Sequence, residues 1–299
     1  MTDAVTARLA ARVRATFPEL EFSHAVLNER GEDHYALMLD GRYVFRFPRH
    51  ANHPTGLGFE LAVLRALKGR CALPMPDYRF LSPGGDFAGY EMIDGVELAP
   101  ERFAELSRAA QETVLEQVAG FLSAMHGLAL EEVVACLGAA PRPWPNSGTP
   151  ADAAAEGRAR RLPPIARAMP ELASLVDDFY ARLALRPPAA QRLTHSDVTL
   201  DHLLLAPSGD RLAGVIDFGD VELGDPAYDF AYLWSYGDWA PGYAFERYSL
   251  KDQEPGLLER TRWHYARYRV SRLGEALDRG WEQVASDIGD ALPALLAGL

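Results

Sequence analysis

The sequence of 299 residues contains few cysteines and no long apolar run. The two cysteines, Cys71 and Cys136, cannot form a disulfide framework and lack metal-ligand spacing, so we expect both to be small fillers of the core. The longest mostly apolar run, residues 118–130, is far shorter than the roughly 20 residues that span a bilayer. Charges are scattered through residues 1–20, which therefore lack the pattern of a signal peptide. We expect a soluble, cytoplasmic protein with no membrane partner.

Basic residues are also scarce. The chain has 30 lysines and arginines against 42 aspartates and glutamates, which gives a formal net charge of -12. Because phosphate contacts need clustered basic side chains, this balance argues against a nucleic-acid partner. It suits a positively charged small ligand, although many enzymes are acidic for solubility alone.

The first third of the sequence has the pattern of strands around one helix, and no internal repeat of about 20–50 residues is visible. The dipeptide Asp40-Gly41 between apolar runs is the strongest short signal for a β-hairpin. The expected elements are a helix over 3–16, hairpin strands over 35–39 and 43–47, a helix over 59–67 and a second hairpin over 78–93.

Beyond Asp94-Gly95 the pattern changes to helices. We expect one long helix over 101–126, a loop with short helical pieces over 139–168, a helix over 172–185, strands within 192–218 and a mostly helical remainder. The predicted fold class is α+β, with a β-rich N-terminal lobe over 1–94, a mainly helical C-terminal lobe over 95–299 and a cleft between the lobes.

Side chains that can bind a metal ion or a substrate flank one predicted hairpin. Its strands are the apolar runs 203–206 and 212–216, and a hairpin returns the chain to where it started. We therefore expect Asp197 and His202 to lie close to Asp217. Such ligands can hold a Mg²⁺ that bridges nucleotide phosphates, with one acidic group left to orient an acceptor hydroxyl. Each fragment alone is more often a cap or turn former, and the interpretation depends on their combination.

The same segment resembles a known family. His195-Ser196-Asp197, with His202 five residues after the aspartate, and Asp217-Phe218-Gly219 are similar to the catalytic and metal-binding loops of the aminoglycoside phosphotransferases, relatives of the protein kinases. The histidine at the metal position is most similar to the 2''-phosphotransferase branch. Further matches are residues 43–49, Glu60, residues 89–95, 121–126 and 224–229, so the resemblance covers roughly residues 25–235. It implies a bilobal, protein-kinase-like fold.

The resemblance also implies roles for individual residues. Asp197 would be the catalytic residue that orients the acceptor hydroxyl and accepts its proton. His202 and Asp217 would ligate Mg²⁺, and Asp229 would brace the catalytic loop. ATP or GTP, the phosphate donor, would be bound by Arg46, by Glu60 as the partner of that arginine, and by the backbone of Glu91, Met92 and Ile93.

Two positions depart from the family pattern. Arg46 stands where the family usually has lysine, and a planar guanidinium does not simply replace a compact ammonium, although it can bind phosphates bidentately. The loop over 29–34 has a single glycine, Gly31, in place of Gly-x-Gly-x-x-Gly. Fewer backbone N–H groups would then face the phosphates.

The acceptor site is expected over Asp197, with walls from the helical lobe. Acidic side chains attract ammonium groups and aromatic faces support them. The candidate acceptor contacts are Asp220, Glu222, Trp234 and Asp238, with Tyr236 and Trp239 near them in the sequence. The alternative is that these aromatics pack the core and the acids are a solvated surface. Three late aromatics, Trp263, Tyr265 and Tyr268, are expected in the core.

Together these features predict a Mg²⁺-dependent kinase that moves the γ-phosphate of ATP or GTP to a hydroxyl of a small molecule, first of all an aminoglycoside-type cationic aminosugar. A macrolide, a choline-like compound or a sugar stays open as acceptor, and so does a role in antibiotic resistance. A nucleotide-binding pseudokinase is a second class, which Arg46 favours. The presence of Asp197, His202 and Asp217 together argues against it, because a binding module does not need all three. A two-metal phosphohydrolase is a third, but His126 and His264 are isolated in the sequence.

Overall fold

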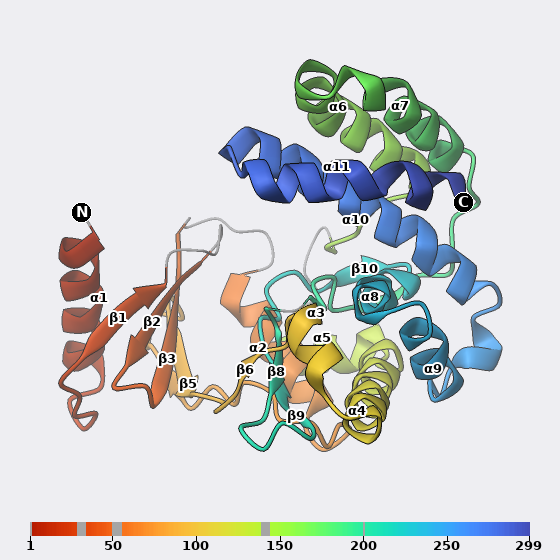
Figure 1. Cartoon of the computed structure of the whole chain (residues 1–299). Coiled ribbons are helices and arrows are strands. Elements are labelled where there is room, and N and C mark those ends of the chain that lie inside the picture. The colour runs from red at the N-terminus through yellow and green to blue at the C-terminus, as the bar shows by residue number, and fades with distance from the viewer. Residues whose placement is uncertain (1, 29–33, 50–55, 139–143, 200) are drawn as a thin grey trace. The chain divides into compact units, whose positions relative to one another are not determined.

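The computed structural model describes residues 2–28, 34–49, 56–138, 144–199 and 201–299. The chain divides into two units, and each is described by itself (Figure 1). The first unit comprises Met1–Gln117, Leu128–Pro145 and Thr199–Val221, and the second comprises Val118–Gly127, Asn146–Val198 and Glu222–Leu299. The division into lobes at Asp94-Gly95 stays a prediction.

A five-stranded antiparallel sheet in the order β1-β2-β3-β5-β4 forms the N-terminal part of the first unit. Its strands are β1 (Ala25–Asn28), β2 (His34–Leu39), β3 (Tyr43–Pro48), β4 (Phe80–Leu81) and β5 (Ala88–Glu91). Leu39 pairs with Tyr43, and Asp40 and Gly41 between them have φ of 50° and 62°, as a tight hairpin turn requires. The first predicted hairpin is therefore confirmed, and the second is present with shorter strands.

Two helices accompany this sheet in the first unit, as predicted. Helix α1 (Thr2–Thr16) lies beside β1 and β2 (Figure 1), and its Leu9 and Val13 are buried with Phe45 and Phe47 of β3. Helix α2 (Gly56–Leu67) buries an apolar face, because its apolar residues recur at the helical period.

The hairpin that was expected to bring His202 close to Asp217 is confirmed in the first unit. Strands β6 (Val96–Glu97), β8 (Leu203–Leu205) and β9 (Leu212–Val215) form a three-stranded sheet in that order. Leu203 pairs with Val215, and the N–H of Ile216 donates to the carbonyl of His202 at 3.0 Å. The backbone before β8 and the backbone after β9 therefore lie side by side.

The single long helix expected over 101–126 is wrong. The chain instead forms α3 (Pro100–Glu105) and α4 (Arg108–His126), and α4 continues from the first unit into the second. Leu106 between them is extended, with ψ of 150°, and the Ser107 hydroxyl accepts from the N–H of Ala110 at 3.2 Å. Ser107 therefore caps a new helix, and apolar periodicity alone does not reveal such a cap. Helix α5 (Leu130–Leu137) follows in the first unit.

Four helices of the second unit share one apolar core. They are α6 (Pro150–Ala168), α7 (Pro170–Ala184), α10 (Leu257–Arg279) and α11 (Glu282–Ala297), which pack together in Figure 1. Phe179 of α7 stacks on Trp263 of α10 with ring centroids 5.9 Å apart, so the prediction that Trp263 is a core residue is confirmed. Tyr265 and Tyr268 are only partly buried, because they lie on another face of α10.

The remaining elements of the second unit are short. They are β7 (Arg192–Thr194), β10 (Glu222–Gly224), α8 (Ala227–Ala231), the 3-10 helix η1 (Tyr232–Tyr236), α9 (Ala240–Glu246) and the 3-10 helix η2 (Lys251–Gln253). Strands β7 and β10 pair antiparallel, with Thr194 opposite Glu222. This pair joins the segment before Asp197 to the segment before α8.

The loop expected over 139–168 is wrong for most of its length. Residues 139–143 lie outside the described residues, but α6 is a helix of 19 residues. Thr149 and Asp152 form a capping box: the Thr149 hydroxyl accepts from the N–H of Asp152 at 3.2 Å, and the Asp152 carboxylate accepts from the N–H of Thr149 at 2.8 Å. This cap begins the helix, and Ile165, just after Pro163 and Pro164, is buried in the apolar core of the second unit.

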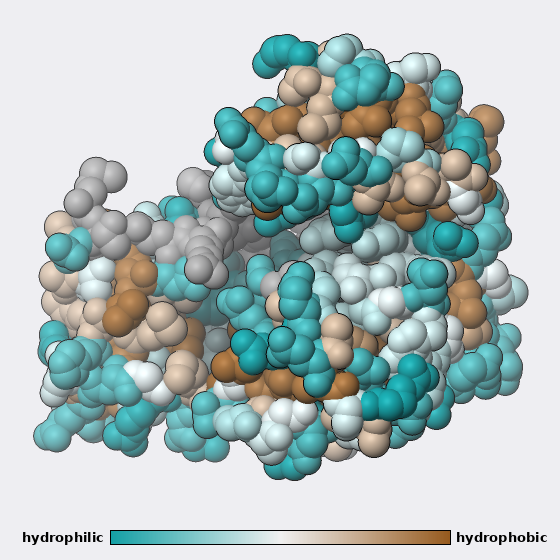
Figure 2. Space-filling view, in the orientation of Figure 1, coloured by the Kyte–Doolittle hydropathy of each residue, from teal (hydrophilic) through white to brown (hydrophobic). Residues whose placement is uncertain are grey.

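Polar residues predominate on the face of the molecule in Figure 2, and apolar residues show in patches, one of them over α6, α7 and α11.

Cys71 and Cys136 are only partly buried, so the expectation that both fill the core is wrong. Cys71 lies beyond the end of α2 and Cys136 near the end of α5.

Within the described ranges no single helix has both the length and the apolar character of a membrane span. The pair α4 and α5, bent by 75°, meets these criteria only when both helices are counted together, as buried core helices also do.

Candidate functional site

Arg46 on β3 is the centre of a buried charged cluster in the first unit. Its Nη1 donates to Asp217 Oδ1 at 2.6 Å and lies 3.5 Å from Glu60 Oε1 on α2. Its Nη2 lies 3.2 Å from His34 Nδ1 on β2. Arg46 is 7% exposed and Glu60 is 2% exposed. The structure thus places Glu60 beside Arg46, as the sequence predicted.

The charges in this cluster depend on one another. Burial opposes the charge on Arg46, but the carboxylates of Glu60 and Asp217 outweigh it, so the Arg46 pKa lies well above its usual value. Burial raises the pKa of Glu60, and the guanidinium of Arg46 only partly offsets this, although the Tyr78 hydroxyl also donates to Glu60 Oε1 at 2.8 Å. A buried charge without a partner costs several kcal/mol, so this cation is held in place by its two acids.

The two predicted metal ligands lie next to each other. His202 Nε2 is 3.6 Å from Asp217 Oδ2, while the other oxygen of Asp217 accepts from Arg46. Asp217 has a φ of 63°, a left-handed backbone that a non-glycine residue adopts at some energetic cost and that is common at functional sites.

This pair is compatible with Mg²⁺, but only with further ligands. Across the described residues, no three His, Cys, Asp or Glu side chains are grouped so that they could hold a metal ion. Mg²⁺ usually binds one or two carboxylates together with water and substrate phosphates, so Asp217 fits that pattern, whereas the imidazole nitrogen of His202 is a less common ligand for this ion. The nucleotide would have to complete the site.

The segment predicted to contact the purine is partly used by the sheet. The N–H of Met92 donates to the carbonyl of Arg42 at 2.7 Å, so this donor is not available to a nucleotide. The Glu91 carboxylate is exposed and lies 3.2 Å from Arg79, and Ile93 is partly buried. Purine binding by this segment stays a prediction. The loop containing Gly31 lies outside the described residues.

In the second unit, a buried carboxylate holds the backbone of the predicted catalytic loop. Asp229 of α8 accepts from the N–H of His195 through Oδ2 and from the N–H of Ser196 through Oδ1, each at 2.8 Å. Asp229 Oδ2 also lies 3.0 Å from His126 Nε2 at the end of α4, and Asp229 and His126 are each 1% exposed. Asp229 therefore braces this loop, as expected from the sequence.

The brace fixes an unusual backbone beside Asp197. Ser196 has a φ of 65°, and the N–H of Asp197 lies 3.3 Å from His195 Nδ1. Asp197 belongs to the second unit, whereas His202 and Asp217 belong to the first, so the predicted proximity of Asp197 to them stays a prediction.

The predicted acceptor residues differ in their surroundings. Glu222 Oε1 accepts from the Ser196 hydroxyl at 3.3 Å and thus lies beside the catalytic loop. Trp234 Nε1 donates to Thr261 on α10 at 2.9 Å. The carboxylates of Asp238 in the second unit and Asp220 in the first are exposed. Glu222 is therefore held beside the catalytic loop by a hydrogen bond.

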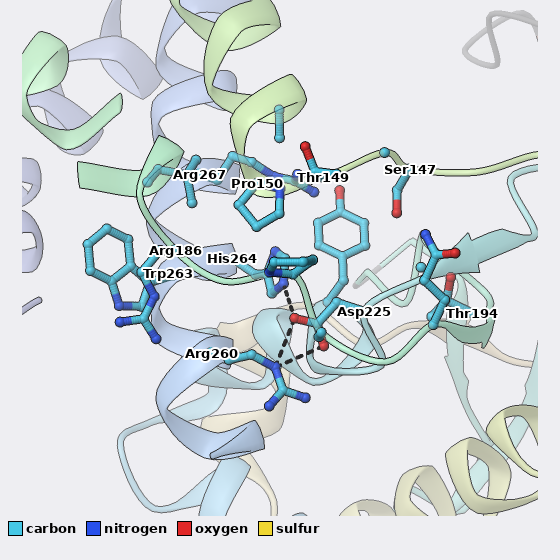
Figure 3. Close-up of a pocket in the computed structure, with 18 of the residues that line it drawn as sticks. Ser147, Thr149, Pro150, Arg186, Thr194, Asp225, Arg260, Trp263, His264 and Arg267 are labelled. Atoms are coloured by element: carbon cyan, nitrogen blue, oxygen red, sulfur yellow. Dashed lines mark hydrogen bonds and ion pairs between the residues drawn. The ribbon is translucent and has the colours of Figure 1, made fainter. Parts of the chain in front are cut away.

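Sequence reasoning missed a pocket of about 470 Å³ in the second unit (Figure 3). One face of α10 contributes Arg260, His264 and Arg267, and the opposite side includes Thr194 and Asp225. Figure 3 shows Arg260 and His264 joined to Asp225 by hydrogen bonds. Their spacing of three and four residues indicates one helix face, but the sequence does not show that this face lines a pocket.

Known proteins resemble this chain in sequence and in fold. The model of the phosphotransferase enzyme family, APH, matches residues 25–270. The solved complex of APH(2'') type IIIa with GDP and kanamycin is 23% identical, with a TM-score of 0.76 over 97% of this chain and 99% of that one. The wild-type aminoglycoside phosphotransferase of type IIIa with GDP is 22% identical, with a TM-score of 0.76 over 98% and 99%. A macrolide 2'-phosphotransferase of type I is 20% identical, with a TM-score of 0.64 over 98% of each chain.

The match to the family model covers most of the chain, and the solved structures share its fold over nearly the whole length. The resemblance and the α+β, kinase-like fold class predicted from the sequence are therefore confirmed. The chain belongs to the APH family of phosphotransferase enzymes and has their kinase-like fold.

Proposed function

We propose that this protein transfers the γ-phosphate of ATP or GTP to a hydroxyl group of a small molecule, with an aminoglycoside-type aminosugar as the first acceptor class to test. The observation that carries the proposal is the buried guanidinium of Arg46, which lies between Glu60 and Asp217. A fixed cation of this kind is suited to phosphate oxygens, and its bond to Asp217 links phosphate binding to the predicted metal ligand.

On the nucleotide side, each group has a separate task. Arg46 would bind phosphate oxygens through its guanidinium fork, and Glu60 would keep that fork oriented. His202 and Asp217 would hold Mg²⁺, which when bound neutralises charge on the phosphate oxygens. The side chains of the chain itself thus provide orientation and one fixed positive charge.

On the acceptor side, Asp197 would accept a hydrogen bond from the acceptor hydroxyl, orient its oxygen toward the γ-phosphorus and take up its proton. As the new P–O bond forms, the bond from the γ-phosphorus to the β-phosphate oxygen breaks and the nucleoside diphosphate leaves. The brace from Asp229 supports this role, because a carboxylate on a loop of fixed backbone has fewer wrong orientations. Phosphoryl transfer needs positioning more than strong basicity, and a loop of fixed backbone provides it.

The choice of an aminosugar is supported by the net charge of -12 and by the similarity to a structure that holds kanamycin. Similarity to a macrolide phosphotransferase favours a second candidate, a kinase of a macrolide or another small alcohol. The two candidates share the reaction and differ only in the acceptor.

The test is transfer of label from γ-labelled ATP and GTP to a panel of aminoglycosides, macrolides, choline and sugars. Asp197→Asn is run beside the wild type, with Asp201→Asn, an exposed aspartate nearby, as the matched control. We expect one acceptor class to be labelled and Asp197→Asn to lower the rate about 10²- to 10⁴-fold. Full activity in Asp197→Asn would contradict the assignment of that residue. Bound nucleotide without transfer would favour a pseudokinase, and free phosphate without an acceptor would favour a hydrolase.

A further inference from the structure

The pocket in the second unit is formed by elements far apart in the sequence. Its walls are the start of α6, the connection from α7 to β7, the paired strands β7 and β10, and one face of α10 (Figure 3). Its volume of about 470 Å³ lies within the range of roughly 300–1,000 Å³ for small-molecule sites. Five apolar side chains, those of Pro150, Leu183, Pro187, Pro188 and Trp263, form much of its lining. The pocket therefore suits a ligand with an apolar body.

The carboxylates on the pocket walls already form hydrogen bonds with other side chains of the protein. Asp225 accepts from Arg260 Nε at 3.1 and 3.0 Å through its two oxygens, and His264 Nε2 lies 2.9 Å from Oδ2. Burial opposes ionisation of Asp225, but His264 and Arg260 outweigh it and hold the Asp225 pKa at about 2. Glu222 accepts from the Ser196 hydroxyl. These acids offer little to the several ammonium groups of a polycation.

The arginines on the walls differ in their partners. Arg186 pairs with Glu259 at 2.7 Å, and Arg260 pairs with Asp225 and with Glu254 at 3.1 Å. Arg267 pairs with no carboxylate among the described residues. Its guanidinium lies 4.7 Å from the centroid of the Tyr228 ring, and its side chain is half-buried. A guanidinium has five N–H donors, so Arg267 retains donors for a ligand.

The histidine on this wall adds no second cation. Burial lowers the pKa of His264, and the charges of Arg267 and Arg260 lower it further, while Asp225 only partly offsets these effects. A neutral His264 that donates from Nε2 to Asp225 leaves Nδ1 as an acceptor, and this buried atom has no hydrogen-bond partner among the described residues. Arg267 is thus the cation on which recognition of a negative group depends.

The pocket also adjoins the catalytic loop within the same unit. Thr194 Oγ1 lies 2.8 Å from the Ser196 hydroxyl, and Glu222 bonds to that hydroxyl from β10. Burial raises the pKa of the Tyr228 hydroxyl; Arg267 opposes this shift, and the charge of Asp197 adds to it. The carboxylate of Asp197 is therefore close enough to affect a side chain on the pocket wall.

We propose that this pocket binds a small molecule that carries a carboxylate or phosphate on an apolar body, and that Arg267 is the contact for its negative group. The ligand has two possible sources. It is either a substituent of the phosphate acceptor, which would then be a small alcohol with a negative group in place of the aminosugar, so that the inference rests on the proposed transfer reaction, or a separate ligand beside the catalytic loop. Both sources require the same chemistry from Arg267 and the same apolar walls.

The test begins with binding, which needs no turnover. Benzoate and phenyl phosphate are titrated beside their neutral counterparts benzamide and phenol, with saturation-transfer NMR and the fluorescence of the protein as readouts. We expect the two anions to bind more tightly than the neutral compounds, and Arg267→Gln to weaken anion binding about 10- to 100-fold, as loss of a charged hydrogen-bond pair does. Arg267→Lys should lie between the two, because it keeps the charge and loses the fork.

The control is Arg167→Gln, which removes an exposed arginine of α6 outside the pocket and should bind the anions as the wild type does. Thermal unfolding of each variant checks that the fold is intact. Equal binding of anions and neutral compounds, or equal anion binding by the wild type and a folded Arg267→Gln, would overturn the proposal. If Arg267→Gln does not fold, equal binding of the anions by Arg267→Lys and the wild type has the same meaning.

A second arm distinguishes the sources. If the negative group belongs to the acceptor, Arg267→Gln should raise KM for a negatively charged acceptor and leave KM for the nucleotide unchanged. If it belongs to a separate ligand, Arg267→Gln should lose the probe anions with KM for the acceptor unchanged. Anion binding without any phosphate transfer would contradict the proposed function and leave the pocket assignment standing.

Discussion

Arg46 and Asp217 are 171 positions apart in the chain and are joined by a hydrogen bond of 2.6 Å. The bond couples the cation expected to bind phosphate to the carboxylate expected to bind metal. Arg46 Nη1 also faces Glu60, so a single guanidinium meets two acids. A lysine at this position would present one compact ammonium group and could not keep the same three-way geometry.

Replacement of this arginine by lysine tests that geometry. We expect Arg46→Lys to fold and to raise KM for ATP and GTP about tenfold, because the charge remains while the fork that joins Glu60 and Asp217 is lost. Steady-state kinetics with each nucleotide give the measurement, with Arg42→Lys, exposed on the same hairpin, as the control. An unchanged KM in Arg46→Lys would show that a point charge is sufficient.

The pair formed by His202 and Asp217 leads to a prediction about metal. His202→Ala should raise the Mg²⁺ concentration needed for half-maximal rate at least about tenfold, since one of two adjacent ligands is removed. Binding of Mn²⁺ in the presence of nucleotide, followed by electron paramagnetic resonance, measures the same loss without turnover. The control is His24→Ala, whose side chain is 86% exposed. An identical metal dependence in His202→Ala would remove this residue from the site.

The brace at Asp229 predicts an effect on rate as well as on stability. In Asp229→Asn the amide can accept through only one atom, so an NH₂ group must face the N–H of His195 or Ser196. We expect kcat to fall with KM for the nucleotide unchanged, and the free energy of unfolding to drop by about 1–3 kcal/mol. Asp178→Asn, exposed on α7, is the control. Loss of stability with a normal kcat would mean that the brace supports the fold without positioning Asp197.

Asp225 predicts a dependence of stability on pH. Its folded-state pKa of about 2 lies below the ordinary value of 3.8, so its contribution is complete above about pH 4 and is lost as the pH falls toward 2. Asp225→Asn should therefore unfold with about 2 kcal/mol less free energy at pH 7, and the difference from the wild type should shrink below pH 4. Urea unfolding at pH 7, 5 and 3 measures it. A constant difference at all three values would show that packing, and not charge, explains the loss.

Local signals in the sequence were enough for the hairpins. Asp40-Gly41 predicted one turn, and the structure has it. The apolar runs on either side of the turn at residues 207–210 predicted the β8–β9 pair, and in the structure this pair brings His202 beside Asp217. A hairpin register depends on neighbours in the chain, so such proximity is predictable from a single sequence. The nucleotide pair Arg46 and Glu60 came only from the family resemblance.

Other features depend on contacts that a pattern does not contain. The break at Ser107 and the start of α6 are set by single capping hydrogen bonds, which apolar periodicity does not register. Arg267 was not predicted, because a polar helix face looks the same whether it borders solvent or a pocket. Its pairing with Tyr228 joins α10 to α8 across a long stretch of chain.

The capping box at Thr149 has a consequence for how this protein can change over evolutionary time. Thr149 begins α6 and also borders the pocket, so a substitution that reshapes the pocket there weakens the start of a helix as well. The connection that contains Pro187 and Pro188 borders the same pocket without starting a helix. Substitutions that alter ligand preference should therefore occur mainly in that connection. Thr149 should change rarely among sequences that derive from this one.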